Sequence, residues 1–83
     1  MQLGKRKNTY YVTVNYKNKK DKYIHVPCGT RYGIVDMITA LNAQGIKSYT
    51  FTLYKNGLRY KEFNLVKSML DFIKFIPLIK EEQ

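Results

Sequence analysis

The sequence predicts an α+β fold, a two-layer sandwich in which a four-stranded, mainly antiparallel sheet carries two helices on one face, in the order ββαββα. Two segments with period-two alternation of apolar and polar residues precede each of two segments with helical spacing. Turn-forming residues separate the two members of each strand pair. A chain of 83 residues has room for one small domain with a thin core. We expect a basic N-terminal arm at 1–8, a single domain at 9–79 and a solvated tail at 80–83.

The first strand pair is expected at 9–16 and 23–28. β-Branched and aromatic residues alternate with polar residues in both segments. The charged stretch 17–21 between them is typical of a turn, so the two strands are expected to form a hairpin. Because Pro27 has no N–H to donate, the second strand either ends there or lies at the edge of the sheet.

The first helix is expected at 31–44. Thr30 is a suitable N-cap because its hydroxyl can accept a hydrogen bond from a backbone N–H of the first turn. Gly45 is a suitable stop, since glycine readily adopts the left-handed conformation that ends many helices. Between them, apolar residues recur at helical spacing, namely Ile34, Ile38 and Leu41.

A second hairpin is expected from 47–54 and 58–63. The Asn56-Gly57 pair between these segments tolerates the positive φ angles of a tight turn. The alternation in 58–63 assigns its residues to two faces, with Leu58 and Tyr60 toward the helices and Arg59 and Lys61 on the opposite side.

The second helix is expected to follow Asn64, a suitable N-cap, and to end before Pro77. Its apolar positions form a wide stripe that faces the sheet. Taken together, the six elements predict one core, formed by Val12, Val14, Ile24, Val26, Ile38, Leu41, Phe51, Leu53, Met69, Leu70 and Ile73.

The charge of the chain is concentrated near its start. The whole sequence has 15 Lys and Arg against 6 Asp and Glu, a formal net charge of +9. Within 1–31, eight basic residues and one acidic residue give +7. These basic residues are Lys5, Arg6 and Lys7 in the arm, Lys17, Lys19, Lys20 and Lys22 around the first turn, and Arg31. A basic arm beside a basic hairpin suits the phosphate backbone of DNA or RNA, although charge runs are more often solvated surface.

The sheet face away from the helices is expected to be polar and aromatic. It would carry Tyr11, Thr13, Asn15, Tyr23, His25, Thr50, Thr52, Tyr54, Arg59 and Lys61, without any carboxylate. The rings of this set have three interpretations: they stack unpaired bases, they contact a protein, or they only form cross-strand pairs that stabilise the sheet.

No catalytic or metal site is expected. His25 and Cys28 are the only histidine and the only cysteine, and two ligands cannot complete a zinc site. Their opposite parity in the strand places them on opposite faces, which disfavours a Cys–His nucleophile pair. Residues 29–33 match no phosphate-binding motif, and a single anion contact through Thr30 and Arg31 is the alternative to a plain turn. We therefore expect a protein that is not an enzyme and uses no cofactor or metal.

Composition indicates the setting. One free cysteine fits a reducing cytoplasm, and no apolar run is long enough to span a membrane. Heavy use of Lys, Asn, Tyr, Ile and Phe reflects AT-rich codons, which favours a phage or mobile element of a low-GC host. Residues 10–41 resemble the arm-type DNA-binding modules at the front of phage integrases, which implies DNA binding. The third strand of that pattern is missing before the helix.

The sequence therefore predicts a small, basic, cytoplasmic nucleic-acid-binding protein. The alternative is an inhibitor or adaptor that binds an acidic or nucleic-acid-binding host protein through the same hairpin and sheet face. No membrane partner is expected. A homodimer stays open, because the apolar end at 75–79 can cover either the core or a second subunit.

Overall fold

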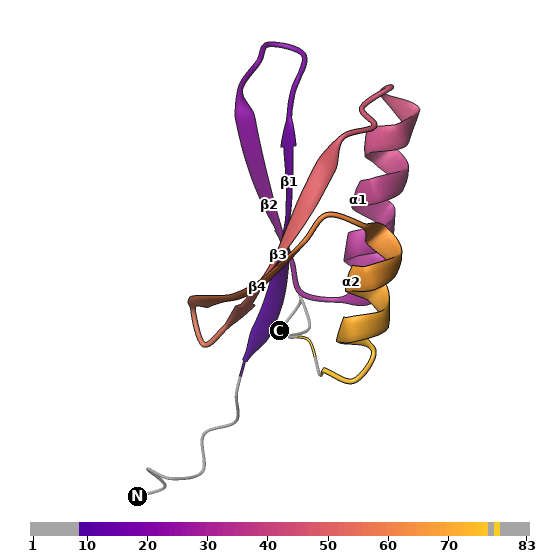
Figure 1. Cartoon of the computed structure of the whole chain (residues 1–83). Coiled ribbons are helices and arrows are strands. Elements are labelled where there is room, and N and C mark those ends of the chain that lie inside the picture. The colour runs from indigo at the N-terminus through magenta and orange to yellow at the C-terminus, as the bar shows by residue number, and fades with distance from the viewer. Residues whose placement is uncertain (1–8, 77, 79–83) are drawn as a thin grey trace, which may run out of the picture.

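The computed structural model describes residues 9–76 and residue 78, and it confirms the predicted element order (Figure 1). The basic arm at 1–8, Pro77 and the tail at 80–83 lie outside the described residues. The elements are β1 (Tyr10–Lys17), β2 (Tyr23–Cys28), α1 (Arg31–Ala43), β3 (Tyr49–Lys55), β4 (Leu58–Phe63) and α2 (Val66–Ile73).

The four strands form one antiparallel sheet in the order β2-β1-β3-β4. The first and third strands of the sequence therefore pair at its centre, with Val12 opposite Leu53 and Val14 opposite Phe51. Strand β2 lies at one edge, as the proline predicts, because an edge strand has one side on which no N–H needs a partner.

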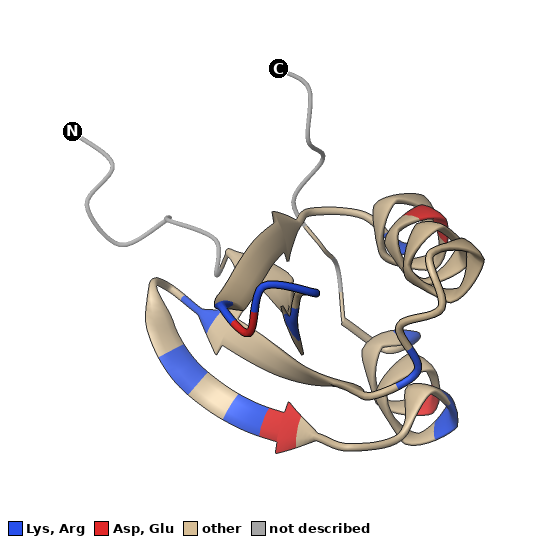
Figure 2. Ribbon diagram, turned by 90° about the horizontal axis from the view of Figure 1, so that it is seen from above, with Lys and Arg blue, Asp and Glu red and all other residues tan. Residues whose placement is uncertain are grey.

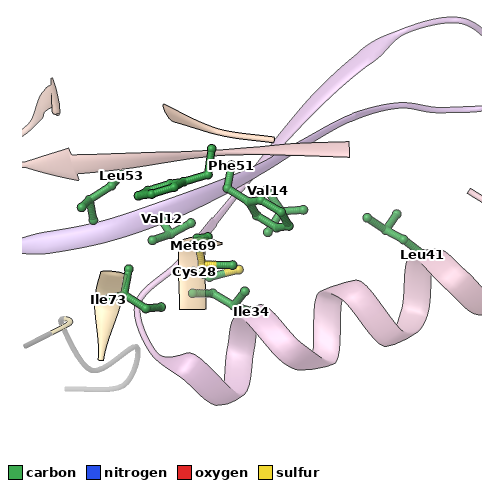
Figure 3. Packing of buried hydrophobic residues seen from close by; sticks show 10 residues of the cluster. Val12, Val14, Cys28, Ile34, Leu41, Phe51, Leu53, Met69 and Ile73 are labelled. Atoms are coloured by element: carbon green, nitrogen blue, oxygen red, sulfur yellow. The ribbon is translucent and has the colours of Figure 1, made fainter. Parts of the chain in front are cut away.

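Both helices pack on the same face of the sheet and complete the two-layer sandwich (Figure 2). Helix α1 packs on β1 and β2, and α2 packs on β3 and β4. The core between the layers consists of Val12, Val14, Cys28, Ile34, Leu41, Phe51, Leu53, Phe63, Met69 and Ile73 (Figure 3). Seven predicted core residues are among them.

The other predicted core residues are only half-buried. Val26, Ile38 and Leu70 pack against the rim of the core, and Ile24 is half-buried near the tip of the first hairpin. Ile24 and Val26 lie in an edge strand, which has a neighbouring strand on one side only. Three residues outside the predicted set, Cys28, Ile34 and Phe63, also belong to the buried core.

Strand β4 departs from the predicted alternation because its register shifts. Leu53 pairs with Lys61 but Tyr54 pairs with Arg59, so Tyr60 is an extra residue, as in a β-bulge. Lys61 consequently shares the helix-side face with Leu53. The expected placement of Lys61 on the opposite side is wrong, and so is the expected burial of Leu58 and Tyr60, which are 73% and 53% exposed.

Helix α2 is shorter than predicted. Its N-cap is Leu65, whose extended backbone carbonyl accepts the first helical bond from Met69, so Asn64 lies one residue too early to cap the helix. The helix ends at Ile73 and not just before Pro77. Phe75 and Ile76 donate to carbonyls three residues back, which tightens the last turn before the proline is reached.

Candidate nucleic-acid interface

The face of the sheet opposite the helices, here called the outer face, gathers nine of the ten residues predicted for it, all except Lys61. The strand registers place them in rows, with Tyr11 opposite Tyr54, Asn15 between His25 and Thr50, and Lys17 opposite Tyr23. The outer face consists of Tyr11, Thr13, Asn15, Lys17, Tyr23, His25, Pro27, Thr50, Thr52, Tyr54, Arg59 and Glu62.

A hydrogen-bond network around Asn15 fills the centre of the outer face. Its Oδ1 accepts from Thr13 Oγ1 at 2.9 Å, and its Nδ2 donates to Thr52 Oγ1 at 3.0 Å. His25 Nδ1 lies 2.7 Å from the same Oδ1. Because an amide oxygen accepts and does not donate, His25 Nδ1 carries the hydrogen in this contact. Thr13 and Thr52 are only 8% and 7% exposed, so this centre is a structural, internally satisfied patch.

Two pairs of parallel rings lie on the outer face. The rings of Tyr11 and Tyr54 stack across β1 and β3, with centroids 4.9 Å apart and planes inclined by 4°. These two tyrosines therefore satisfy the cross-strand interpretation. Tyr23 and His25 are parallel but further apart, at 6.4 Å, and Tyr23 is 70% exposed. Tyr23 is consequently the tyrosine of this face with most surface available to a partner.

The charges of the outer face differ from the expectation at two positions. Arg59 Nη1 lies 3.0 Å from Glu62 Oε2, and Glu62 pairs with Thr52, so a carboxylate does lie on this face. Lys61 lies on the helix side instead, where its Nζ is 5.6 Å from the Phe63 ring centroid and 5.7 Å from that of Phe72. The bulge explains both errors, since it inverts the facing of every residue beyond it.

The β1–β2 loop presents three lysines, Lys19, Lys20 and Lys22, here called the loop lysines. Asn18 Oδ1 accepts from the backbone N–H of Lys20 at 2.8 Å and of Lys22 at 3.0 Å. Asp21 adopts a left-handed φ of 67°, which completes the turn. The loop extends well beyond the start of β3 (Figure 1). The loop lysines thus stand on a defined turn at the end of the molecule.

The remaining predicted cation, Arg31, is not part of this surface. It begins α1, which follows the end of β2 that is furthest from the loop. The Thr30 hydroxyl already caps α1 by accepting from Gly33 N at 3.0 Å. Arg31 instead lines a groove of about 840 Å³ between the helices, together with Tyr32, Val35, Leu70 and Lys74. The structure therefore separates Arg31 from the hairpin cations.

Lys47 is a basic residue near the hairpin that the sequence interpretation missed. It lines a surface hollow of about 520 Å³ near the tip of the first hairpin, along with Lys17, Tyr23 and Thr50. The predicted strand at 47–54 included Lys47, but β3 starts only at Tyr49, so Lys47 lies in the segment before the strand. The pairing of β1 with β3 brings Lys47 close to the first hairpin, and the sequence alone does not reveal this pairing.

The chain matches no family model, no curated protein and no solved structure. Across residues 9–76 and 78, His, Cys, Asp and Glu form no group of three or more that could hold a metal ion. No helix in that part of the chain is long and apolar enough to cross a membrane. His25 and Cys28 lie on opposite faces, because His25 pairs with Asn15 on the outer face and Cys28 with buried Val12.

Proposed function

We propose that this chain is a small, non-catalytic nucleic-acid-binding protein that contacts phosphate groups with the loop lysines. The observation that carries this proposal is the exposure of three cations on one ordered turn. The ion pairs of the described residues are Lys17–Asp21, Arg59–Glu62 and Lys67–Asp71, and the loop lysines take part in none of them. Their positive charge is therefore available to a partner.

Phosphate is the partner chemistry that fits this turn best. Lysine ammonium groups act as point charges on flexible stems, and each phosphate they neutralise releases condensed counterions. Contacts of this kind are independent of base sequence and weaken as salt concentration rises. The net charge of +9 adds long-range attraction to a polyanion. A cytoplasmic setting, in the host of a phage or mobile element, is part of the proposal and is supported by the composition.

The test replaces the loop lysines together, as Lys19→Ala, Lys20→Ala and Lys22→Ala. A control variant loses the same charge on the helix side, as Lys61→Ala, Lys67→Ala and Lys74→Ala. Binding to labelled DNA and RNA is titrated at about 50 mM and about 200 mM salt. We expect the loop variant to reduce the slope of log K against log salt by about 0.7–0.9 for each phosphate that it no longer neutralises, whereas the control keeps most of its slope.

Two results would contradict this proposal. One is an equal loss of affinity in both variants, which would show that only net charge matters. The other is the absence of any binding tighter than about 100 μM at low salt, where non-specific binders already associate.

A protein partner is the second candidate, and the helix-side groove favours it. Tyr32 and Val35 are exposed there beside the charged groups of Arg31 and Lys74. Exposed aromatic and arginine side chains are enriched at the centres of protein interfaces. This candidate predicts that Tyr32→Ala abolishes capture of the partner while the loop variant retains it, the reverse of the result expected for nucleic acid.

A further inference from the structure

The hollow near the tip of the first hairpin exists because two pairings end at different positions. Strands β1 and β3 stay paired as far as Tyr16 and Tyr49, whereas β1 and β2 continue to Lys17 and Tyr23. The hairpin therefore extends past the start of β3. The hollow of about 520 Å³ lies in this step and is lined by Asn15, Tyr16, Lys17, Tyr23, Ile46, Lys47, Ser48, Tyr49 and Thr50.

The wall of the hollow that carries Lys47 is fixed by its neighbours. Ile46 N donates to Leu41 O at 2.9 Å, and the Ile46 side chain packs against the core. Tyr49 donates its hydroxyl hydrogen to Asn42 Oδ1 at 3.1 Å. Both flanks of Lys47 and Ser48 are thus tied to α1. The hollow consequently has a defined shape on the side opposite the hairpin.

The lining combines cations, hydroxyl groups and one exposed ring. Lys17 and Lys47 supply two ammonium groups, and Ser48 and Thr50 supply hydroxyls. The Tyr23 ring lies on the hairpin side, with Lys17 Nζ 5.2 Å from its centroid. None of the described residues that line the hollow carries a carboxylate. This combination matches an anion joined to a flat ring.

We propose that the hollow takes one unpaired nucleotide of a single-stranded nucleic acid, with its base on the Tyr23 ring and its phosphate between Lys17 and Lys47. The inference rests on the proposed function and makes it more specific. The volume lies within the range of about 300–1,000 Å³ that is usual for small-molecule sites. Cation–π contacts and ion pairs at exposed sites are weak, so Lys17 can leave both the Tyr23 ring and Asp21, whose carboxylate oxygen lies 3.8 Å from its Nζ, when a nucleotide arrives.

Single strands are selected because the Tyr23 ring needs the free face of a base. In a duplex each base is stacked on its neighbours, and reaching a side-chain ring would require flipping the nucleotide out. In a single strand the base is already available, and stacking on aromatic side chains is the usual source of affinity for such strands. The loop lysines, by contrast, contact phosphate in either form.

The experiment measures anisotropy of three labelled probes at one low salt concentration. The probes are an oligothymidylate of about 12 nucleotides, an abasic strand of the same length and a duplex of the same length. The variants are Tyr23→Ala, Tyr23→Phe, which keeps a ring, and Lys47→Ala. Lys55→Ala is the charge-matched control for Lys47→Ala, because Lys55 lies at the far end of β3.

We expect Tyr23→Ala to weaken oligothymidylate binding by about 5- to 100-fold and Tyr23→Phe to retain it. Binding of the abasic strand and of the duplex should be unaffected by Tyr23→Ala, since neither presents an unpaired base. Lys47→Ala should weaken oligothymidylate binding more than Lys55→Ala does. Tyr23 is exposed, so both variants should fold, which a thermal melt verifies.

The outcomes separate this inference from the proposed function. If Tyr23→Ala leaves oligothymidylate binding unchanged, or weakens all three probes equally, the single-strand inference is wrong. The proposed function still stands in that case if the loop-lysine variant loses binding to every probe. If none of the probes binds the unmodified protein, both are wrong.

Discussion

At the scale of single residues, Asn15 joins three strands of the outer face. Its amide contacts Thr13 in β1, His25 in β2 and Thr52 in β3, and it is half-buried. The low exposure of the two threonines means that water cannot fully replace a lost partner. The network therefore stabilises the sheet and also fixes the ring of His25, which stacks beside Tyr23.

We expect Asn15→Ala to lower the free energy of unfolding by about 1–3 kcal/mol, because it leaves buried hydroxyl groups without their amide partner. Urea denaturation followed by circular dichroism measures the change. Asn64→Ala is the matched control: Asn64 is exposed and does not cap α2, so its replacement should change stability by less than about 0.5 kcal/mol. Equal effects of the two substitutions would contradict the structural role of the network.

Period-two parity predicted the facing of Tyr11, Asn15 and Tyr23, because these residues lie in strands without interruption. Period-two parity could not predict which face Lys61 lies on, since nothing in the local pattern marks Tyr60 as an extra residue. The sequence did not indicate the role of Lys47 for a different reason. Its role depends on the neighbouring β1–β2 hairpin, and contacts between distant segments leave no periodic signal.

At the scale of elements, the clearest turn and cap residues in the sequence predicted the element boundaries correctly, whereas the less distinct ends of α2 were predicted wrongly. Asn56 and Gly57 adopt φ angles of 54° and 83°, as a tight hairpin turn requires, and the Thr30 cap forms as predicted. Both ends of helix α2 were predicted wrongly, because its limits depend on how the chain leaves β4 and packs its last turn.

The two edge strands of the sheet are protected against pairing with a second chain. The bulge and the charged residues protect β4, and Pro27 protects β2. A homodimer through the apolar end at 75–79 stays a prediction.

Helix α2 has eight residues, of which Met69 and Ile73 are buried in the core. Met69 is fully buried and its neighbour Leu70 is half-buried at the rim. Met69→Ala should therefore cost about 2–5 kcal/mol of stability through the cavity it leaves, and Leu70→Ala should cost clearly less. Urea midpoints of the two variants provide the comparison. A larger loss for Leu70→Ala would show that α2 is rotated relative to the structure described above.

At the scale of the whole molecule, the chain consists of two ββα halves that share one core. Val12 and Val14 from the first half lie opposite Leu53 and Phe51 from the second, all fully buried. Neither half can bury these residues alone. The expected result is that a peptide of residues 9–45 shows no cooperative thermal transition by circular dichroism, whereas the full chain does. A cooperative transition in the peptide would indicate that each half is an autonomous unit.

The central pairing of β1 with β3 also determines how the chain reaches its fold. Paired residues are separated by 33 positions at Tyr16 and Tyr49 and by 45 positions at Tyr10 and Lys55. Each hairpin closes locally and rapidly, whereas the central pair closes a loop that contains β2 and α1. The entropy of that closure is lost before the buried contacts compensate for it. We therefore expect the encounter of the two halves to limit the folding rate, and this chain to fold more slowly than a helical bundle of equal length.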